Sequence, residues 1–443
     1  MLRRSGVKIL NEIYEEALNW LYSLRRFGMK LGLDNVEALL KISGNPHENA
    51  RGVHIAGTNG KGSVAAMLSS ITKAGGYRVG TYTSPHLISF EERMLIDGKP
   101  IERDTLLRYI ERYREIAESL NKKGVYPTFF ELTTAIAFDY FREMAADIWV
   151  VETGMGGRLD ATNILRFKTG VITRIGMDHT EHLGKTLENI AWEKAGIIKE
   201  GMNIVTAESG ETLRVIEKKA KKVGAQVFSL KRDFDYRIFS SDIGGVECIV
   251  KGIYDEYNLH IPLVGRHQAE NAALSVAAAE LMKGDGIYLE KSAIISGINN
   301  VRWRGRFDIV SRDPIVVLDA AHNPDGARVL RNALIDAGLW GKYTLVLGML
   351  SDKDARSFAE ILMKGSVKTI ITEPEYRPRA MKMEELLKIT SEYGEVEGVR
   401  KPRDAVCRAI EYGNPVLVTG SIYLLGDVLS SIDFNGVDRK KLC

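Results

Sequence analysis

Short apolar runs alternate along the chain with longer segments whose apolar residues recur at three- and four-residue intervals. The first pattern is typical of buried strands and the second of amphipathic helices. Their alternation indicates an α/β fold with a mostly parallel sheet and helices on both faces. The predicted strands cover 52–56, 77–83, 147–151 and 170–173, and the predicted helices cover 9–27, 34–42, 62–75, 102–120, 130–145, 186–199 and 267–283.

The pattern changes twice in the second half of the chain. Residues 225–263 are richer in β-branched and aromatic residues with turn signals, which predicts a small β-rich extension. After residues 299–305 a second series begins, and this predicts a first domain over 1–300 and a smaller Rossmann-like α/β domain over 301–443. Its predicted strands, at 315–319, 343–348, 367–372 and 415–418, alternate with helices.

Composition narrows the class of protein. The chain has 443 residues and a formal net charge of +3, which argues against a protein that coats nucleic acid or a polybasic membrane protein. No stretch approaches the roughly 18 apolar residues that a membrane-spanning helix needs. The three cysteines are far apart, and the N-terminal residues lack a long apolar run. We therefore expect a cytoplasmic protein that acts on small molecules, without nucleic-acid or membrane partners.

The segment 54–64, HIAGTNGKGSV, carries the strongest chemical signal. An apolar run leads into glycines that permit a tight turn with free backbone N–H groups. Lys61 supplies a positive charge, and Ser63 supplies a hydroxyl that can bind Mg²⁺. A strand, such a loop and a helix N-terminus form a phosphate site. A glycine-rich turn without a ligand is the alternative. The glycine between Lys61 and Ser63 departs from the standard Walker A spacing.

A carboxylate and a lysine are candidates to complete this site. Glu152 ends an apolar run and precedes a glycine-rich segment, so it would lie at the carboxyl edge of the sheet, where a Mg²⁺ ligand is expected. A salt bridge in a capped turn explains it equally well. Lys194 lies on a predicted helix. It is either a solvated or ion-paired lysine, or a desolvated one that reacts with CO₂ to give a carbamate able to hold a second metal.

The segment 178–184, DHTEHLG, follows another predicted strand. His179 and His182 invite a zinc interpretation, but no cysteine or third histidine stands at ligand spacing. A single histidine joining Mg²⁺ is the other possibility. For His182 alone, a surface or packing role is the better interpretation.

Two further motifs mark the start of the second domain. Asp319 ends a predicted strand, and Asn323-Pro324 is a helix-start signal, so Asp319 binds a ribose hydroxyl or a cation, or belongs to a capped turn. The basic segment 302–306, RWRGR, lies at the predicted hinge. It would clamp triphosphate charge in a closed state, or it is a solvated linker.

Together these motifs resemble the folylpolyglutamate synthase and dihydrofolate synthase family, within the wider Mur ligase group. The similar segments run in consistent order over roughly residues 12–430. They are 22–33, 54–64, Ser84-Pro85-His86-Leu87, 152–163, 193–197 and 319–326.

The resemblance implies an ATP-dependent ligase that joins L-glutamate to a folate- or pteroate-type acid through an acyl phosphate, releasing ADP and phosphate. It implies ATP, two Mg²⁺ sites and a carbamate on Lys194 as cofactors, and we expect a monomer. The implied catalytic residues are Lys61, Lys194 and His322. The implied ATP contacts are Thr58, Asn59, Gly60, Lys61, Gly62, Ser63, Asn271, Arg306 and Asp319. The implied metal ligands are Ser63, Ser84, Glu152, His179 and Lys194, and the implied acid-binding residues are Thr128, Phe129 and Asp160.

Two other functions stay open at this point. One is a Mur-type ligase acting on a different pterin or on a peptidoglycan-like acid. The other is a P-loop ATPase or regulatory module without ligase activity. The Lys194 segment and the Asp319 motif argue against the second, because plain hydrolysis needs neither.

Overall fold

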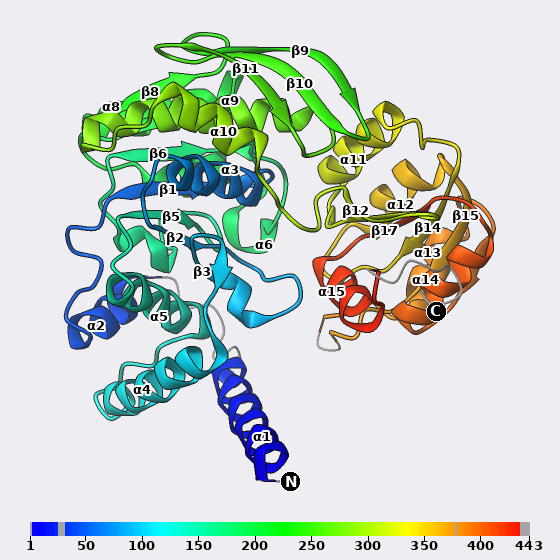
Figure 1. Cartoon of the computed structure of the whole chain (residues 1–443), viewed down its shortest axis with the longest axis horizontal. Helices are drawn as coiled ribbons and strands as arrows, with labels where there is room; N and C mark the ends of the chain where they lie inside the picture. The colour runs from blue at the N-terminus through cyan, green and yellow to red at the C-terminus, as the bar shows by residue number, and fades with distance from the viewer. Residues whose placement is uncertain (1, 25–31, 377–378, 435–443) are drawn as a thin grey trace.

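The computed structural model describes residues 2–24, 32–376 and 379–434, and residues 25–27 of the first predicted helix lie outside this range. The chain forms two lobes, each built on its own sheet (Figure 1). No described helix has both the length and the apolar character that crossing a membrane requires.

The first lobe contains an eight-stranded sheet in the order β4-β3-β2-β5-β1-β6-β7-β8. The six neighbouring strands β2-β5-β1-β6-β7-β8 pair in parallel, whereas β3 and β4 add an antiparallel edge next to β2. Ile55 pairs with Glu152, and Ala56 pairs with Ile172, so β1, β5 and β6 end at one edge. The strands are β1 (Gly52–Ala56), β2 (Val79–Tyr82), β3 (Met94–Ile96), β4 (Lys99–Pro100), β5 (Ile148–Glu152), β6 (Thr169–Ile172), β7 (Asn203–Thr206) and β8 (Gln226–Ser229).

Helices cover both faces of this sheet, which confirms the predicted fold class. One face packs against α3 (Lys61–Ala74), α9 (His267–Leu281) and α10 (Lys291–Asn299). The other face packs against α1 (Leu2–Ser23), α2 (Asp34–Ile42), α4 (Arg103–Asn121) and α5 (Phe129–Glu143). Nearer the β8 edge, α8 (Gly210–Val223) packs on the sheet together with the residues that follow α7 (Leu187–Lys194), and α6 (Thr180–Leu183) precedes α7. The predicted helix 186–199 is shorter in the structure, because a 3₁₀ turn over Ala195–Ile197 follows α7.

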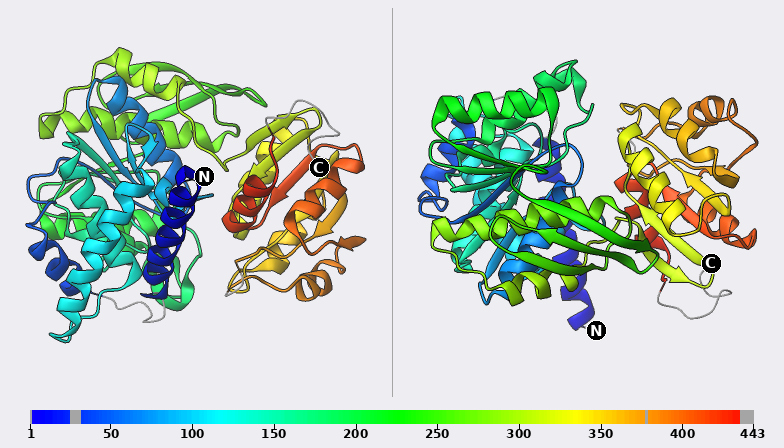
Figure 2. Two further views of the ribbon diagram at one scale, coloured as in Figure 1. Left: turned by 60° about the horizontal axis from the view of Figure 1, so that its bottom comes forward. Right: turned by 90° about the horizontal axis from the view of Figure 1, so that it is seen from above.

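A separate antiparallel sheet corresponds to most of the predicted β-rich extension. It consists of β9 (Asp235–Asp242), β10 (Gly245–Lys251) and β11 (Glu256–Ile261), in the order β11-β10-β9. The predicted start at residue 225 is wrong, because Gln226–Ser229 pairs in parallel with β7 as the edge strand of the central sheet. A short edge strand and the first strand of an extension have the same sequence pattern. In Figure 2 this small sheet extends from the first lobe toward the second.

The second lobe is a six-stranded sheet in the order β12-β13-β17-β14-β15-β16, parallel except for β12. Its helices pack as α11, α12 and α13 on one face and α14 and α15 on the other. The strands are β12 (Asp308–Arg312), β13 (Ile315–Asp319), β14 (Tyr343–Leu347), β15 (Ser366–Ile371), β16 (Val396–Gly398) and β17 (Val416–Thr419). The helices are α11 (Pro324–Asp336), α12 (Ala355–Met363), α13 (Met383–Thr390), α14 (Pro402–Glu411) and α15 (Ile422–Ser431).

Candidate active site

The predicted phosphate loop joins β1 to α3. Gly60 has a φ of 93° and stands at the N-cap of α3, where no side chain caps the helix. A Cβ atom at Gly60 would lie 2.6 Å from Oδ1 of Asn271, so the loop and α9 are in close contact here. Thr58 ties the loop to the segment after β6, since its hydroxyl accepts from the backbone N–H of Gly176 at 3.0 Å. The uncapped helix N-terminus leaves backbone donors and the positive end of the helix dipole for an anion.

Lys61 and Glu152 face each other across the edge of the sheet. The Lys61 Nζ lies 3.7 Å from Oε1 of Glu152 and donates to the carbonyl of Thr58 at 3.3 Å. The other carboxylate oxygen of Glu152 accepts from the backbone N–H of Ser84 at 3.4 Å. Burial raises the pKa of Glu152, and the nearby Lys61 charge opposes this rise. The ends of β1, β2 and β5 therefore bring a cation, a carboxylate and a serine together, as the strand order requires.

Lys194 is buried next to the phosphate loop. Its side chain comes from the end of α7, and the residue is only 3% exposed. Its Nζ donates to the carbonyl of Gly57 at 2.6 Å. Burial, followed by the charge of Lys61, lowers the pKa of Lys194 to about 7. A large fraction of this amine is therefore neutral near pH 7, which is the form that reacts with CO₂.

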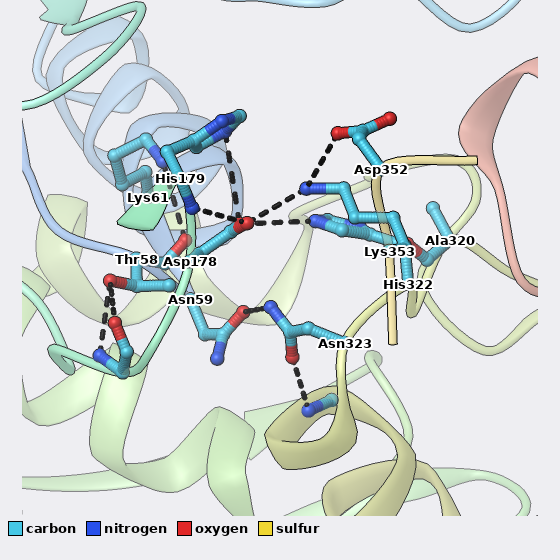
Figure 3. Close-up of polar contacts among 12 residues, drawn as sticks. Thr58, Asn59, Lys61, Asp178, His179, Ala320, His322, Asn323, Asp352 and Lys353 are labelled. Atoms are coloured by element: carbon cyan, nitrogen blue, oxygen red, sulfur yellow. Dashed lines mark hydrogen bonds and ion pairs between the residues drawn. The ribbon is translucent and has the colours of Figure 1, made fainter. Parts of the chain in front are cut away.

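Asp178 joins the two lobes. Its carboxylate lies 2.7 Å from Nζ of Lys353 and 3.5 Å from Nε2 of His322, both from the second lobe (Figure 3). It also lies 3.8 Å from Nε2 of its neighbour His179. Burial by itself would raise the pKa of Asp178, but His322, His179 and Lys353 together hold that pKa far below its usual value. Burial lowers the pKa of His179 to about 4, so this imidazole is neutral at pH 7.

A second contact between the lobes runs from the phosphate loop to the start of α11. The Nδ2 of Asn323 donates to Oδ1 of Asn59 at 3.4 Å (Figure 3). Asn323 also caps α11, because its Oδ1 accepts from the backbone N–H of Gly326 at 2.7 Å. The same side chain thus orients the second-lobe helix and touches the phosphate loop.

Asp319 and Arg306 lie on the second lobe near this contact. The two oxygens of Asp319 accept backbone N–H groups from Phe307 at 2.8 Å and Ala321 at 2.9 Å. Burial raises the pKa of Asp319, and the Arg306 charge opposes the rise. Within the basic hinge segment, Arg302 and Arg304 are exposed and Arg306 is half-buried. Arg304 lies 3.7 Å from the carboxylate of Asp308, and of the three arginines Arg306 is the least exposed.

The residues predicted to bind the acid substrate are buried and already bonded to their surroundings. Thr128 caps α5, and its hydroxyl accepts from the backbone N–H of Glu131. Phe129 stacks on Tyr22 with ring centroids 5.6 Å apart. Asp160 accepts from the backbone N–H groups of Met155 at 2.8 Å and Thr162 at 3.0 Å. All three lie on the side of the sheet covered by α5, and their binding role stays a prediction.

The predicted metal ligands surround the loop without forming a complete cage. Within residues 2–24, 32–376 and 379–434, no group of three or more histidine, cysteine, aspartate or glutamate side chains is placed to hold a metal. Mg²⁺ rarely needs such a group, since it keeps several waters and binds one or two carboxylates together with substrate phosphates. The carboxylate of Glu152 and the hydroxyls of Ser63 and Ser84 are hard oxygen donors of the right kind. His182 is exposed, in keeping with a surface role.

Sequence reasoning missed Lys353 and the bridging role of Asp178. Lys353 stands in an ordinary polar loop, yet its side chain is only 9% exposed and lies 2.7 Å from Asp178 of the first lobe. The available signal was its place shortly after β14, at the carboxyl edge of the second sheet, where ligands of α/β proteins bind.

Comparison with known proteins identifies the family. The family model of the Mur ligase middle domain matches residues 55–279, and that of the Mur ligase glutamate ligase domain matches residues 305–422. The chain belongs to the Mur ligase family. Among curated relatives of this Mur ligase, the dihydrofolate synthase/folylpolyglutamate synthase of Bacillus subtilis (strain 168) is 35% identical over 426 residues. The match covers 94% of this chain and 98% of that protein.

Solved structures agree with this assignment. A folylpolyglutamate synthase from Thermotoga maritima superposes with a TM-score of 0.84 at 33% identity, covering 97% of this Mur ligase and 99% of that chain. A Mycobacterium tuberculosis folylpolyglutamate synthase, complexed with ADP and AMPPCP, gives a TM-score of 0.85 at 32% identity and covers 94% and 98% of the two chains. The protein is a ligase of the dihydrofolate synthase/folylpolyglutamate synthase family, which confirms the family expected from its motifs.

Proposed function

We propose that this ligase joins L-glutamate to a folate- or pteroate-type carboxylic acid at the expense of ATP. The observation that carries the proposal is the convergence of both lobes on the phosphate loop. Lys61 and Glu152 of the first lobe lie 3.7 Å apart there, and Asp178 holds Lys353 and His322 of the second lobe beside them. A module that only hydrolyses ATP would not need charged groups from a second lobe at this point.

The reaction proceeds in two steps in this proposal. An oxygen of the acid's carboxylate attacks the γ-phosphorus of ATP, and the bond from that phosphorus to the ADP oxygen breaks. The amine of L-glutamate then attacks the acyl carbon, phosphate leaves and the amine loses a proton. Phosphoryl transfer depends mainly on positioning and charge neutralisation. Lys61 supplies a positive charge, and contact between the lobes shields the acyl phosphate from water.

ATP contacts are proposed on both lobes. Thr58, Asn59, Gly60, Gly62 and Ser63 would surround the phosphates together with Lys61, at the uncapped start of α3. The ADP and AMPPCP complex of the Mycobacterium tuberculosis relative supports a nucleotide in this family. The remaining proposed contacts are Asn271 on α9 and Arg306 and Asp319 on the second lobe.

Two Mg²⁺ ions are proposed beside the phosphates, where they would neutralise phosphate charge when bound. Ser63, Ser84, Glu152 and His179 would hold them. The low pKa of His179 supports this role, because only a neutral imidazole offers a free nitrogen lone pair to a metal.

Lys194 is proposed to carry a carbamate. The neutral amine attacks CO₂, forms an N–C bond and releases one proton, leaving a carboxylate at the end of the side chain. Burial and a pKa of about 7 favour the neutral amine that this reaction needs. The added negative charge would then assist metal binding next to the carbonyl of Gly57.

The acid is proposed to bind near Thr128, Phe129 and Asp160, on the α5 side of the sheet. A Mur-type ligase acting on a different pterin or on a peptidoglycan-like acid is the second candidate. We further propose that the protein works as a monomer in the cytoplasm. His322, which lies beside Asp178, is proposed to be a catalytic residue.

A substrate panel tests the proposal. Dihydropteroate, tetrahydrofolate and a methanopterin-like acid are each incubated with ATP and L-glutamate, and the products are weighed by mass spectrometry. We expect a glutamate adduct with the pteroate- or folate-type acid, with equal amounts of ADP and phosphate. An adduct with the methanopterin-like acid alone would support the second candidate instead.

A further inference from the structure

A buried polar chain runs beneath the loop that follows β5. His54 lies in the middle of β1 and is only 1% exposed. Its Nε2 lies 2.8 Å from Oγ1 of Thr162, and that hydroxyl lies 2.5 Å from Oδ1 of Asp160. The chain therefore connects the central strand of the sheet to one of the residues proposed to bind the acid. The prediction from sequence had not included His54.

Hydrogen-bond counting fixes the direction of this chain. A threonine hydroxyl has one proton, and the Thr162 hydroxyl donates it to the carboxylate of Asp160. Nε2 of His54 must therefore be the donor toward Thr162. The other ring nitrogen, Nδ1, has no partner and is buried. A neutral imidazole with its proton on Nε2 satisfies all these contacts, and burial followed by the charge of Lys199 lowers the pKa of His54, which favours this neutral form.

The far end of the chain shapes the loop itself. The second oxygen of Asp160 accepts from the backbone N–H of Met155 at 2.8 Å, so this carboxylate closes the glycine-rich loop on itself. A Cβ atom at Gly154, one residue earlier, would lie 2.4 Å from the ring of Phe130. The loop thus packs against the start of α5, where Thr128 and Phe129 lie. Its position relative to α5 depends on Asp160 staying in place.

A purely structural explanation leaves the choice of histidine unexplained. Neighbouring positions on β1, such as Val53 and Ile55, are aliphatic and fully buried. An aliphatic residue at position 54 would avoid the cost of burying a polar ring with one unpaired nitrogen. The ring provides a donor at a fixed distance from the strand, and a fully buried chain of this kind holds its members rigidly.

We propose that His54 is a positioning residue for the acid pocket, which it shapes by holding Asp160 and the 154–160 loop in place through Thr162. The inference rests on the proposed function for its kinetic consequence, but the hydrogen-bond chain can be tested without any activity.

Steady-state kinetics test whether His54 affects the binding of the acid. Leucine at position 54 removes the donor, whereas glutamine places an amide nitrogen the same number of bonds from the backbone as Nε2. We expect His54→Leu to raise KM for the acid about tenfold, with little change in KM for ATP, and His54→Gln to stay within about twofold of wild type. The double variant with Thr162→Val should be no worse than Thr162→Val alone, because both break one chain. Val53→Ala, on the opposite face of β1, is the control for lost stability and should leave KM for the acid unchanged.

A nitrogen-15 NMR spectrum of histidine-labelled wild-type protein tests the chain itself. His54, assigned by its absence in His54→Gln, should show the neutral form protonated at Nε2, and its signals should shift in Thr162→Val. A proton on Nδ1, or an imidazolium, would overturn the inference. Equal rises in KM for ATP and acid in His54→Leu would also overturn it. If wild-type protein joins glutamate to no acid, the proposed function fails. The NMR result still shows whether His54 donates a hydrogen bond to Thr162.

Discussion

The two lobes contribute to the candidate site in different ways. The first-lobe groups are deeply buried and bonded within their own lobe: Lys194 is 3% exposed and Glu152 is 5% exposed. The second-lobe groups are held across an interface, and the side chain of His322 is 37% exposed. Their attachment to the first lobe includes the Asp178–Lys353 pair and the Asn59–Asn323 hydrogen bond. The first-lobe half of the candidate site is therefore built in advance, whereas the second half depends on how the lobes meet.

The largest expected effect concerns the buried lysine of the first lobe. Lys194→Ala should lower ligase activity about a hundredfold or more, because it removes the side chain proposed to carry the carbamate that assists metal binding. Formate or acetate should restore part of this activity by replacing the carbamate.

Lys199→Ala is the matched control, since Lys199 is half-buried and desolvation lowers its pKa to about 7 as well, but its Nζ donates to Asn163 instead of the phosphate loop. Carboxylates should not rescue this variant. Full activity in Lys194→Ala, or equal rescue of both variants, would refute the carbamate.

A change in the phosphate loop should have the next largest effect. Gly60→Ala forces alanine into a left-handed conformation and brings its Cβ to 2.6 Å from Oδ1 of Asn271. We expect KM for ATP to rise about tenfold or more, at about 1.4 kcal/mol per factor of ten.

Gly76→Ala distinguishes the effect of backbone strain from the effect of the contact with Asn271. Gly76 has a φ of 85° but no atom within 4 Å of the added Cβ. In thermal unfolding, Gly76→Ala should lose about as much stability as Gly60→Ala does, but its KM for ATP should not change. An unchanged KM in Gly60→Ala would mean that the loop does not hold the nucleotide.

Breaking the Asp178–Lys353 pair tests whether the second-lobe groups depend on contact between the lobes. Asp178→Asn leaves the buried ammonium of Lys353 without its closest carboxylate, so we expect kcat/KM for glutamate to fall about tenfold. Small-angle X-ray scattering should show a larger radius of gyration.

Asp352→Asn is its control, because Asp352 lies 3.8 Å from the same Nζ but belongs to the second lobe and pairs with Arg379. It should leave the radius of gyration unchanged. Wild-type behaviour of Asp178→Asn would show that the lobes are held by other contacts.

The smallest effect concerns pH. Because the pKa of Lys194 is about 7, the amine is mostly neutral at pH 8 and mostly protonated at pH 6. The neutral form alone reacts with CO₂, so activity should fall several-fold from pH 8 to pH 6, and added bicarbonate should recover more activity at pH 6 than at pH 8. Initial rates at both pH values, with and without bicarbonate, check this. A rate independent of bicarbonate throughout would contradict it.

The sequence predicts elements of both lobes, and it also misses elements of both: β13 (Ile315–Asp319) has its predicted bounds, whereas β7 (Asn203–Thr206) and α8 (Gly210–Val223) were not predicted. β1 and α2 have the predicted bounds, and Lys61, Glu152 and Lys194 meet because parallel strands end at one edge. The short strands β12 and β16 were missed, since half-exposed strands of this length carry little periodic signal. Asp178 and Lys353 are 175 residues apart, and their contact depends on how two lobes pack, which no local pattern records. His54 was missed because a buried histidine resembles any other core position.

In the proposed reaction a carboxylate, and not water, accepts the γ-phosphate of ATP. The acid substrate is labelled with oxygen-18 in its carboxylate and incubated with ATP, L-glutamate and the wild-type enzyme. If an acyl phosphate forms and glutamate displaces phosphate from it, each amide formed leaves one labelled oxygen in the released phosphate. Unlabelled phosphate, released at the same rate without glutamate, would contradict the account.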